Sequence, residues 1–248
     1  MPDKNLIKSV SVFNQVTKSN LSNQFVNQRL DSAISTWFEP SISSFIPEDK
    51  NIFEYDSSGV ILSNTDYNWD DNLNIWDLDD KEEYSFDSLG RVSVIIESWW
   101  DDNSTLWMSD YREEFTYNSN GDIELELEFE YQNDSIWVER WKTEYTYNGT
   151  DLELIFDYYW DYDSLNWQAD SKFEFIYLGG VLTESYEYYW DNTYWKPDSK
   201  DVYTLDNNDN ITEVVRYYWF SSVQAWKEGN KREYEYDTEG NPNLEVYY

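Results

Sequence analysis

The feature that most constrains the fold is an internal repeat. The stretch Lys81–Val92, Lys-Glu-Glu-Tyr-Ser-Phe-Asp-Ser-Leu-Gly-Arg-Val, occurs in seven related versions along the chain. Repetition at a period of 20 to 50 residues is typical of proteins whose units pack mainly on their neighbours. We therefore predict a repeat domain over residues 45–248, after a non-repeat segment at 1–44 that serves as a cap, plug or linker. The units are 28 to 31 residues apart and start at Lys50, Lys81, Arg112, Lys142, Lys172, Lys200 and Lys231.

Each unit is predicted to be a β-hairpin. Its second strand alternates strictly, because apolar side chains occupy every second position of residues 122–131 and acidic ones fill most of the others. A period of two is typical of a strand with one apolar and one polar face. The same reasoning places four aromatic residues of the preceding strand on one face: Trp107, Tyr111, Phe115 and Tyr117. Gly121 in the intervening turn is free to adopt positive φ.

Short turns between all neighbours predict an all-β fold, an antiparallel β-meander of about 14 strands. A flat sheet of that width would leave a large aromatic face exposed, so the sheet must curl. We predict a sheet coiled into a spiral or flattened tube with the aromatic face inside; the alternative is a closed barrel. The apolar spacing of Leu21, Phe25, Leu30, Ile34 and Trp37 predicts a short helix over residues 17–36.

Composition excludes several classes of function. The 248-residue chain has 51 Asp and Glu against 17 Lys and Arg, a net charge of −34, which argues against nucleic acid as a partner. Aromatic residues make up 20% of the chain, unlike a disordered acidic segment. The absence of Cys and His excludes thiolate zinc sites, cysteine nucleophiles and His-based triads. We find no apolar run of about 18 residues, so membrane insertion is not expected.

Two parts of the unit resemble known repeats. Tyr84-Ser-Phe-Asp-Ser-Leu-Gly-Arg-Val and Tyr234-Glu-Tyr-Asp-Thr-Glu-Gly-Asn resemble the YD repeat, Tyr-x-Tyr-Asp-x-x-Gly-Arg/Asn-Leu. The Trp- and Tyr-rich stretch Tyr158–Lys172 resembles repeats of proteins that Bacteroidetes secrete through the type IX system. The resemblance covers about residues 45–248. It implies a spiralling sheet and an extracellular or cell-surface location, and it implies almost nothing about activity.

Acidic loops follow several second strands and are candidate Ca²⁺ sites, since carboxylate oxygens are the ligands that Ca²⁺ prefers. The alternative is that Asp and Asn are ordinary turn residues there. No other cofactor is expected. The candidate ligands are Asp70, Asp71, Asp101, Asp102, Asp161 and Asp163.

Four aromatic residues are predicted to lie on the polar face, next to the last aromatic residue of their unit: Trp99, Tyr159, Tyr189 and Tyr218. Exposed rings of this kind can stack on sugars, so these are the candidate glycan-binding residues. The other aromatic rows are predicted to be core. Separately, three serines in Asp-Ser-Leu or Asp-Ser-Ile turns resemble O-glycosylation acceptors of Bacteroidetes: Ser88, Ser135 and Ser164.

Paired carboxylates are a further candidate. Glu82/Glu83, Glu113/Glu114 and the Glu124–Glu130 run could mimic the pairs of glycosidases. They recur in successive units beside Lys81 and Arg112, which favours charge pairing across strands. We therefore do not expect an enzyme.

The function predicted first is an extracellular structural or adhesive repeat protein, a subunit of a surface layer, fibre or appendage. Its partner would be a second copy, joined edge to edge. One alternative is a carbohydrate-binding module that binds surface glycans through exposed aromatic residues. Another is a protective shell of the YD type.

Overall fold

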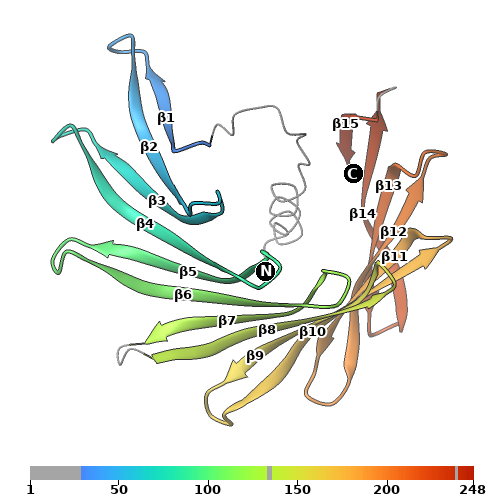
Figure 1. Cartoon of the computed structure of the whole chain (residues 1–248). Coiled ribbons are helices and arrows are strands. Elements are labelled where there is room, and N and C mark those ends of the chain that lie inside the picture. The colour runs from blue at the N-terminus through green and yellow to red at the C-terminus, as the bar shows by residue number, and fades with distance from the viewer. Residues whose placement is uncertain (1–28, 133–135, 238–239) are drawn as a thin grey trace.

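The computed structural model describes residues 29–132, 136–237 and 240–248, which form one sheet of 15 strands paired in chain order (Figure 1). Every pairing is antiparallel, so the predicted all-β meander is confirmed. The strands are β1 Ser32–Glu39, β2 Ser44–Tyr55, β3 Ile61–Asp70, β4 Ile75–Phe86, β5 Val92–Asp101, β6 Leu106–Tyr117, β7 Ile123–Gln132, β8 Ile136–Asn148, β9 Asp151–Asp161, β10 Asn166–Leu178, β11 Val181–Trp190, β12 Trp195–Leu205, β13 Ile211–Phe220, β14 Ala225–Tyr236 and β15 Pro242–Tyr247.

The sheet is curved and open (Figure 1). Strand β1 pairs only with β2 and β15 only with β14, so the predicted coiled sheet is confirmed and the alternative closed barrel is wrong. Among the described residues, no helix is long and apolar enough to span a membrane.

The prediction of an N-terminal helix is wrong where the structure describes that segment. Residues 29–31 are irregular and residues 32–36 belong to β1; the rest of the predicted helix, residues 17–28, lies outside the described residues. Strand β1 carries apolar side chains on both faces, because Ile34 pairs with Lys50 on one face and Trp37 pairs with Ile46 on the other. The alternation that marks a strand is therefore hidden there.

A one-residue β-bulge in each even-numbered strand reverses the face of its side chains. In β6, Ser109 lies opposite Ser98 but Tyr111 lies opposite Glu97, so Asp110 is the extra residue. Trp107 therefore points to one face and Tyr111 to the other. The prediction that Trp107, Tyr111, Phe115 and Tyr117 share a face is wrong, since a slip of one residue flips all later side chains. Both faces of the sheet are aromatic, and the expected division into an aromatic and a polar face is not observed.

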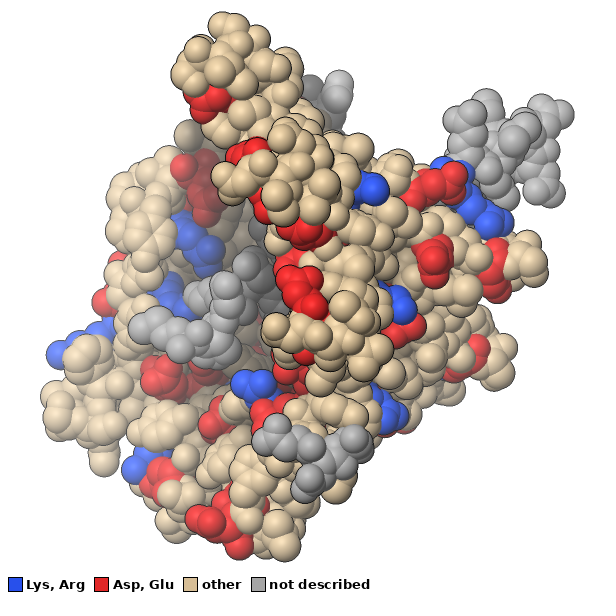
Figure 2. All heavy atoms as spheres, turned by 90° about the vertical axis from the view of Figure 1, so that its left-hand side faces the viewer, with Lys and Arg blue, Asp and Glu red and all other residues tan. Residues whose placement is uncertain are grey.

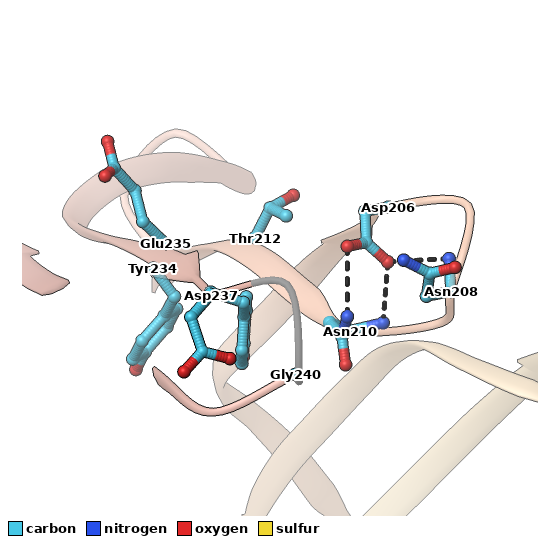
Figure 3. Close-up of a pocket in the computed structure, with 9 residues that line it drawn as sticks. Asp206, Asn208, Asn210, Thr212, Tyr234, Glu235, Asp237 and Gly240 are labelled. Carbon is cyan, nitrogen blue, oxygen red and sulfur yellow. Dashed lines mark hydrogen bonds between the residues drawn. The ribbon is translucent and has the colours of Figure 1, made fainter. Parts of the chain in front are cut away.

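The Asp-x-x-Gly element is a hydrogen-bonded turn. Asp87 Oδ1 accepts hydrogen bonds from the backbone N–H of Leu89 (2.8 Å) and Arg91 (3.0 Å), and Gly90 has φ of 79°. In the equivalent turn of Figure 3, Asp206 binds the N–H of Asn208 and Asn210 in the same way. These aspartates are turn residues whose oxygens the backbone already uses.

A tyrosine just before the turn ties the units together. The Tyr117 hydroxyl donates to the carbonyl of Val92 at 2.6 Å, and the Arg91 guanidinium lies 4.2 Å from the Tyr117 ring. Tyr55 repeats the arrangement with Leu30 (3.1 Å) and Arg29 (5.5 Å). Strand β1 is thus the second strand of a further, incomplete unit of the repeat.

The sheet is a single layer with almost no enclosed core. Val214, at 6% exposure, is the one hydrophobic residue of the described chain that is buried. Stability must therefore come from the backbone ladder and from contacts between side chains of neighbouring strands on each face. Both faces are accessible, so both are considered below as sites.

Candidate functional site

The bulges give the sheet two faces of different chemistry. One, the tryptophan face, carries cross-strand ring pairs and a row of cations; the other, the carboxylate face, carries a row of acidic residues. Figure 2 shows acidic side chains spread over one side of the molecule, with basic ones among them.

The tryptophan face is a ladder of ring pairs, one wherever an odd-numbered strand pairs with the strand that follows it, from β1 with β2 to β13 with β14. In the pair of β9 and β10, Trp160 and Trp167 have centroids 5.2 Å apart and ring planes at 75°. This edge-to-face arrangement adds to the free energy that burial provides. Edge-to-face or tilted pairs with centroids 5.0 to 5.3 Å apart recur at Phe38–Phe45, Trp69–Trp76, Trp100–Trp107, Tyr131–Trp137, Trp190–Trp195 and Trp219–Trp226.

A row of cations crosses the same face, and most of them pair with a carboxylate. The exceptions among the described residues are Lys50 and Lys200, which lie over aromatic rings and have no carboxylate oxygen within 4.0 Å. Lys142 Nζ lies 4.0 Å from the Tyr158 ring centroid and 2.8 Å from Glu144 Oε1. Lys172 repeats this with Tyr188 at 4.1 Å and Glu174 at 2.6 Å. Stacking on a ring and pairing with a carboxylate leave no free charge for a ligand. Glu83 and Glu114 also pair with cations, but these are Lys81 and Arg112 of the same strand, so the expected pairing across strands is wrong for them.

The carboxylate face differs, because Glu82, Glu113, Glu126 and Glu128 have no Lys or Arg within 4.0 Å among the described residues. For these residues the prediction of charge pairing is wrong. Glu82 lies directly opposite Glu97, and Glu113 lies directly opposite Glu128. Like charges in such positions repel each other.

The acidic row is densest where β6 meets β7. One carboxylate oxygen each from Glu113, Glu126 and Glu128 lies within 4.8 Å of the others. Burial, and then the charges of Glu126 and Glu128, raise the pKa of Glu113 to about 8, so this side chain is mostly protonated at neutral pH. Glu126 is 7% exposed and accepts a hydrogen bond of 3.0 Å from the Tyr145 hydroxyl. The group can share protons, and its oxygens are of the type that binds Ca²⁺.

Cations return to the carboxylate face in its C-terminal part, over β12 to β14. Arg216 Nε and Nη2 donate to the two carboxylate oxygens of Asp201, at 2.7 and 2.5 Å. This bidentate pair is largely buried, since Asp201 is 7% exposed. Glu187 accepts from Ser199 Oγ at 2.9 Å. The acidic row therefore continues into a part where its charge is compensated.

The predicted Ca²⁺ ligands do not come together. Asp101 Oδ1 accepts the N–H of Asn103 (3.1 Å) and Asp161 Oδ1 that of Asp163 (3.0 Å); Asp70 accepts the N–H of Asn72 (2.7 Å). Side-chain hydrogen bonds from Ser104 and from Ser164 are the main cause of the lowered pKa of Asp101 and of Asp161. Asp71, Asp102 and Asp163 are exposed in the loops. Ca²⁺ binding at these six residues stays a prediction.

The aromatic candidates do occupy equivalent positions on the carboxylate face. Trp99 is 45% exposed, Tyr159 38%, Tyr189 43% and Tyr218 38%. Trp37, which is 41% exposed on β1, holds the same position and was missed because its strand resembled a helix. The sequence does indicate the position of Trp37, because it lies 62 residues before Trp99, which is two repeat periods. Of the three serines, Ser88 and Ser164 are exposed in turns and Ser135 lies outside the described residues.

The hollow in Figure 3 lies between neighbouring turns and is lined by Asp206, Asn210, Thr212 and Tyr234, among others. Asp206 already accepts two backbone N–H groups and the Asn210 side chain, so its carboxylate is occupied by the turn itself. We do not regard this hollow as a ligand site.

No protein-family model and no curated protein sequence matches the chain. Solved structures with some similarity include a protein of unknown function from Bacteroides fragilis (TM-score 0.34, 11% identity, 61% of this chain and 89% of the other). A DUF3836 family protein from Parabacteroides distasonis has a TM-score of 0.27 and 22% identity over 36% of this chain and 87% of the other. A TcdB2-TccC3 structure has a TM-score of 0.32 and 10% identity over 90% of this chain and 16% of the other. A porin-like protein from Bacteroides uniformis has a TM-score of 0.32 and 10% identity over 81% of this chain and 94% of the other. These TM-scores lie below 0.5, so the similarities identify neither a family nor a function.

Proposed function

We propose that the protein is an extracellular structural or adhesive repeat protein and that copies of it associate through the edges of their sheets. The observation that carries this proposal is a single-layer sheet of 15 strands whose two edge strands, β1 and β15, each pair on one side only. Unpaired backbone groups along an edge are a template for a further strand. The YD-type shell is not proposed, because an open sheet does not by itself enclose a lumen.

The edge groups of β15 can be assigned from its pairing with β14. Tyr248 and Lys231 exchange two backbone hydrogen bonds, of 2.9 and 3.3 Å. In an antiparallel ladder such pairs alternate with pairs that are not bonded. The N–H groups of Glu245 and Tyr247 therefore point away from β14. They are the donors that a second copy would use.

Strand direction restricts how two copies can join. Fifteen antiparallel strands in chain order leave β1 and β15 running in the same direction. A junction of β15 with β1 of the next copy, with both faces continuous, would make a parallel pair. Antiparallel pairing, which the chain uses throughout, requires like edges to meet around a two-fold axis, β15 with β15 or β1 with β1. Alternating junctions of these two kinds would build a fibre.

The test is sedimentation of the 30.0 kDa chain at increasing concentration, followed by negative-stain microscopy. We expect concentration-dependent dimers and longer assemblies. Glu245→Pro removes an outward donor and should abolish the β15 junction, whereas the matched control Glu245→Ala should not. A chain that stays monomeric at millimolar concentration, or a proline variant that assembles like the control, contradicts the proposal.

A further inference from the structure

Three tyrosines occupy the same position on successive odd-numbered strands of the carboxylate face. Tyr159 lies on β9, Tyr189 on β11 and Tyr218 on β13, and each is about two-fifths exposed. The same position holds Asn68 on β3 and Glu130 on β7, so the uninterrupted run of rings is confined to the C-terminal half of the sheet. We call these three residues the tyrosine row.

Two of the three rings, those of Tyr159 and Tyr218, are held by their surroundings. A Cβ atom added at Gly229 would lie 2.3 Å from Tyr218 Cε2, so the Tyr218 ring lies against the backbone of β14 where any larger residue would displace it. The Tyr159 ring packs against Trp141, with centroids 6.3 Å apart and planes at 66°. Rings fixed in this way lose little freedom when a flat ligand covers them.

The rings are separated and do not form an apolar patch. Successive members lie two strands apart, and β10 advances from Gln168, opposite Tyr159, to Ser171, opposite Tyr189, over one bulge. Two strand spacings and about two residues of stagger place neighbouring rings roughly 12 Å apart. On the following strand the residues directly opposite the rings are polar: Gln168 faces Tyr159, Lys196 faces Tyr189 and Lys227 faces Tyr218. On the preceding strand Tyr159 lies opposite Trp141.

This arrangement selects the class of ligand. A protein partner needs a continuous apolar centre from which charged residues are depleted, and the lysines beside these rings prevent one. Two of the cations in this part are compensated, because Arg216 pairs with Asp201, and Lys196 pairs with Asp191 at 2.6 Å. Lys227 lies over the Phe220 ring instead, 4.5 Å from its centroid. A polyanion would gain little from this lysine on a chain with a net charge of −34. A neutral sugar chain offers apolar ring faces and, between them, hydroxyl groups.

We propose that the tyrosine row is a binding platform for an uncharged linear polysaccharide. Pyranose rings stack on Tyr159, Tyr189 and Tyr218, and the hydroxyl groups between them hydrogen-bond to Gln168, Lys196 and Lys227. The site is independent of the edge strands, so it can function in a single copy or in an assembly.

The test is affinity electrophoresis of the full chain in gels that contain hydroxyethylcellulose, galactomannan or alginate. We expect retardation by at least one of the two neutral polymers and little by the polyanion alginate. Tyr189→Ala should weaken binding about tenfold, in line with the loss of an anchoring aromatic. Tyr189→Phe should bind like the original chain because it keeps the ring. Tyr162→Ala, which removes a 49% exposed tyrosine from a loop outside the row, is the matched control.

Gly229→Ala gives a second test, since it moves the Tyr218 ring without removing it and should also weaken binding. Circular dichroism of each variant checks that the sheet is intact. The proposal is overturned if neither neutral polymer retards the chain, if alginate alone does, or if Tyr189→Ala binds as tightly as Tyr162→Ala.

Discussion

The two faces of this sheet are built from the same strands but handle charge in opposite ways. On the tryptophan face, Lys142 and Lys172 each lie over a ring and beside a glutamate. On the carboxylate face, Glu82 and Glu113 lie opposite other glutamates. One face is thus a structural ladder in which most cations are paired, while the other carries opposed carboxylates with raised pKa values and a series of exposed rings. Sites are to be sought on the second face.

The largest expected effect concerns the C-terminal part of the carboxylate face, where Arg216 and Asp201 form a largely buried ion pair. Arg216→Ala leaves the buried Asp201 carboxylate without its bidentate partner, and we expect a loss of about 3 kcal/mol in the free energy of unfolding. Urea denaturation measures it. The double variant with Asp201→Ala should recover part of the loss. A loss below about 1 kcal/mol would mean that solvent replaces the pair.

On the tryptophan face, Trp160→Ala should cost about 2 kcal/mol, because it removes buried area and an edge-to-face contact with Trp167. Trp99→Ala is the comparison, since Trp99 is 45% exposed and makes no ring pair among the described residues. We expect it to cost less than half as much by the same urea assay. Equal losses would show that the two faces do not differ in how they use tryptophan.

The charge of the carboxylate face should make stability depend on pH. Burial raises the pKa of Glu113 to about 8 and also raises that of Glu97, so the folded chain binds protons that the unfolded chain releases near pH 4.5. Stability should therefore fall as pH rises from about 4.5 to 8. Glu113→Gln should flatten this fall and stabilise the chain at pH 9 by about 1 kcal/mol. Melting temperatures at pH 5, 7 and 9 measure it; an unchanged slope contradicts the assignment.

The smallest effect concerns the cation row. Lys142→Ala should cost only about 0.5 kcal/mol, because an ion pair that solvent partly reaches and a cation–π contact each contribute little in water. The loss should shrink further in 0.5 M NaCl, which screens the pair with Glu144. Denaturation at low and high salt tests this. A loss above about 2 kcal/mol would show that the row does more than neutralise charge.

Much of the architecture could be predicted because turns and alternation are local signals. The Asp87–Gly90 turn, the alternation of residues 122–131 and the period together predict an antiparallel meander, and the structure has one. Strand β1 was missed because both of its faces are apolar. The chemistry of the two faces was missed for another reason. A bulge such as that at Asp110 depends on how the strand pairs with its neighbour. Aspartate recurs at this position, as at Asp170 and Asp198, but an aspartate alone does not distinguish a bulge from an ordinary strand residue.

The same local limit explains the partial success with the candidate site. Exposed rings at Trp99, Tyr159, Tyr189 and Tyr218 could be singled out because they occupy one position of the period. The cluster of Glu113, Glu126 and Glu128 could not, because it depends on which residues meet across β6 and β7. Register of this kind is a property of the assembled sheet.

The mid-strand bulge has a consequence for how such a chain can vary. Side chains alternate between the two surfaces along each strand, and the bulge exchanges the two sets: Trp107 and Tyr111 are four residues apart, yet they lie on opposite surfaces. One surface can therefore be changed only at every second position, and that set of positions switches at the bulge, while the residues between them keep the composition of the opposite surface. The two surfaces of such a sheet can therefore vary in sequence independently of each other. Removing or duplicating a whole hairpin would shorten or lengthen both surfaces by two strands. Every remaining side chain would keep its surface.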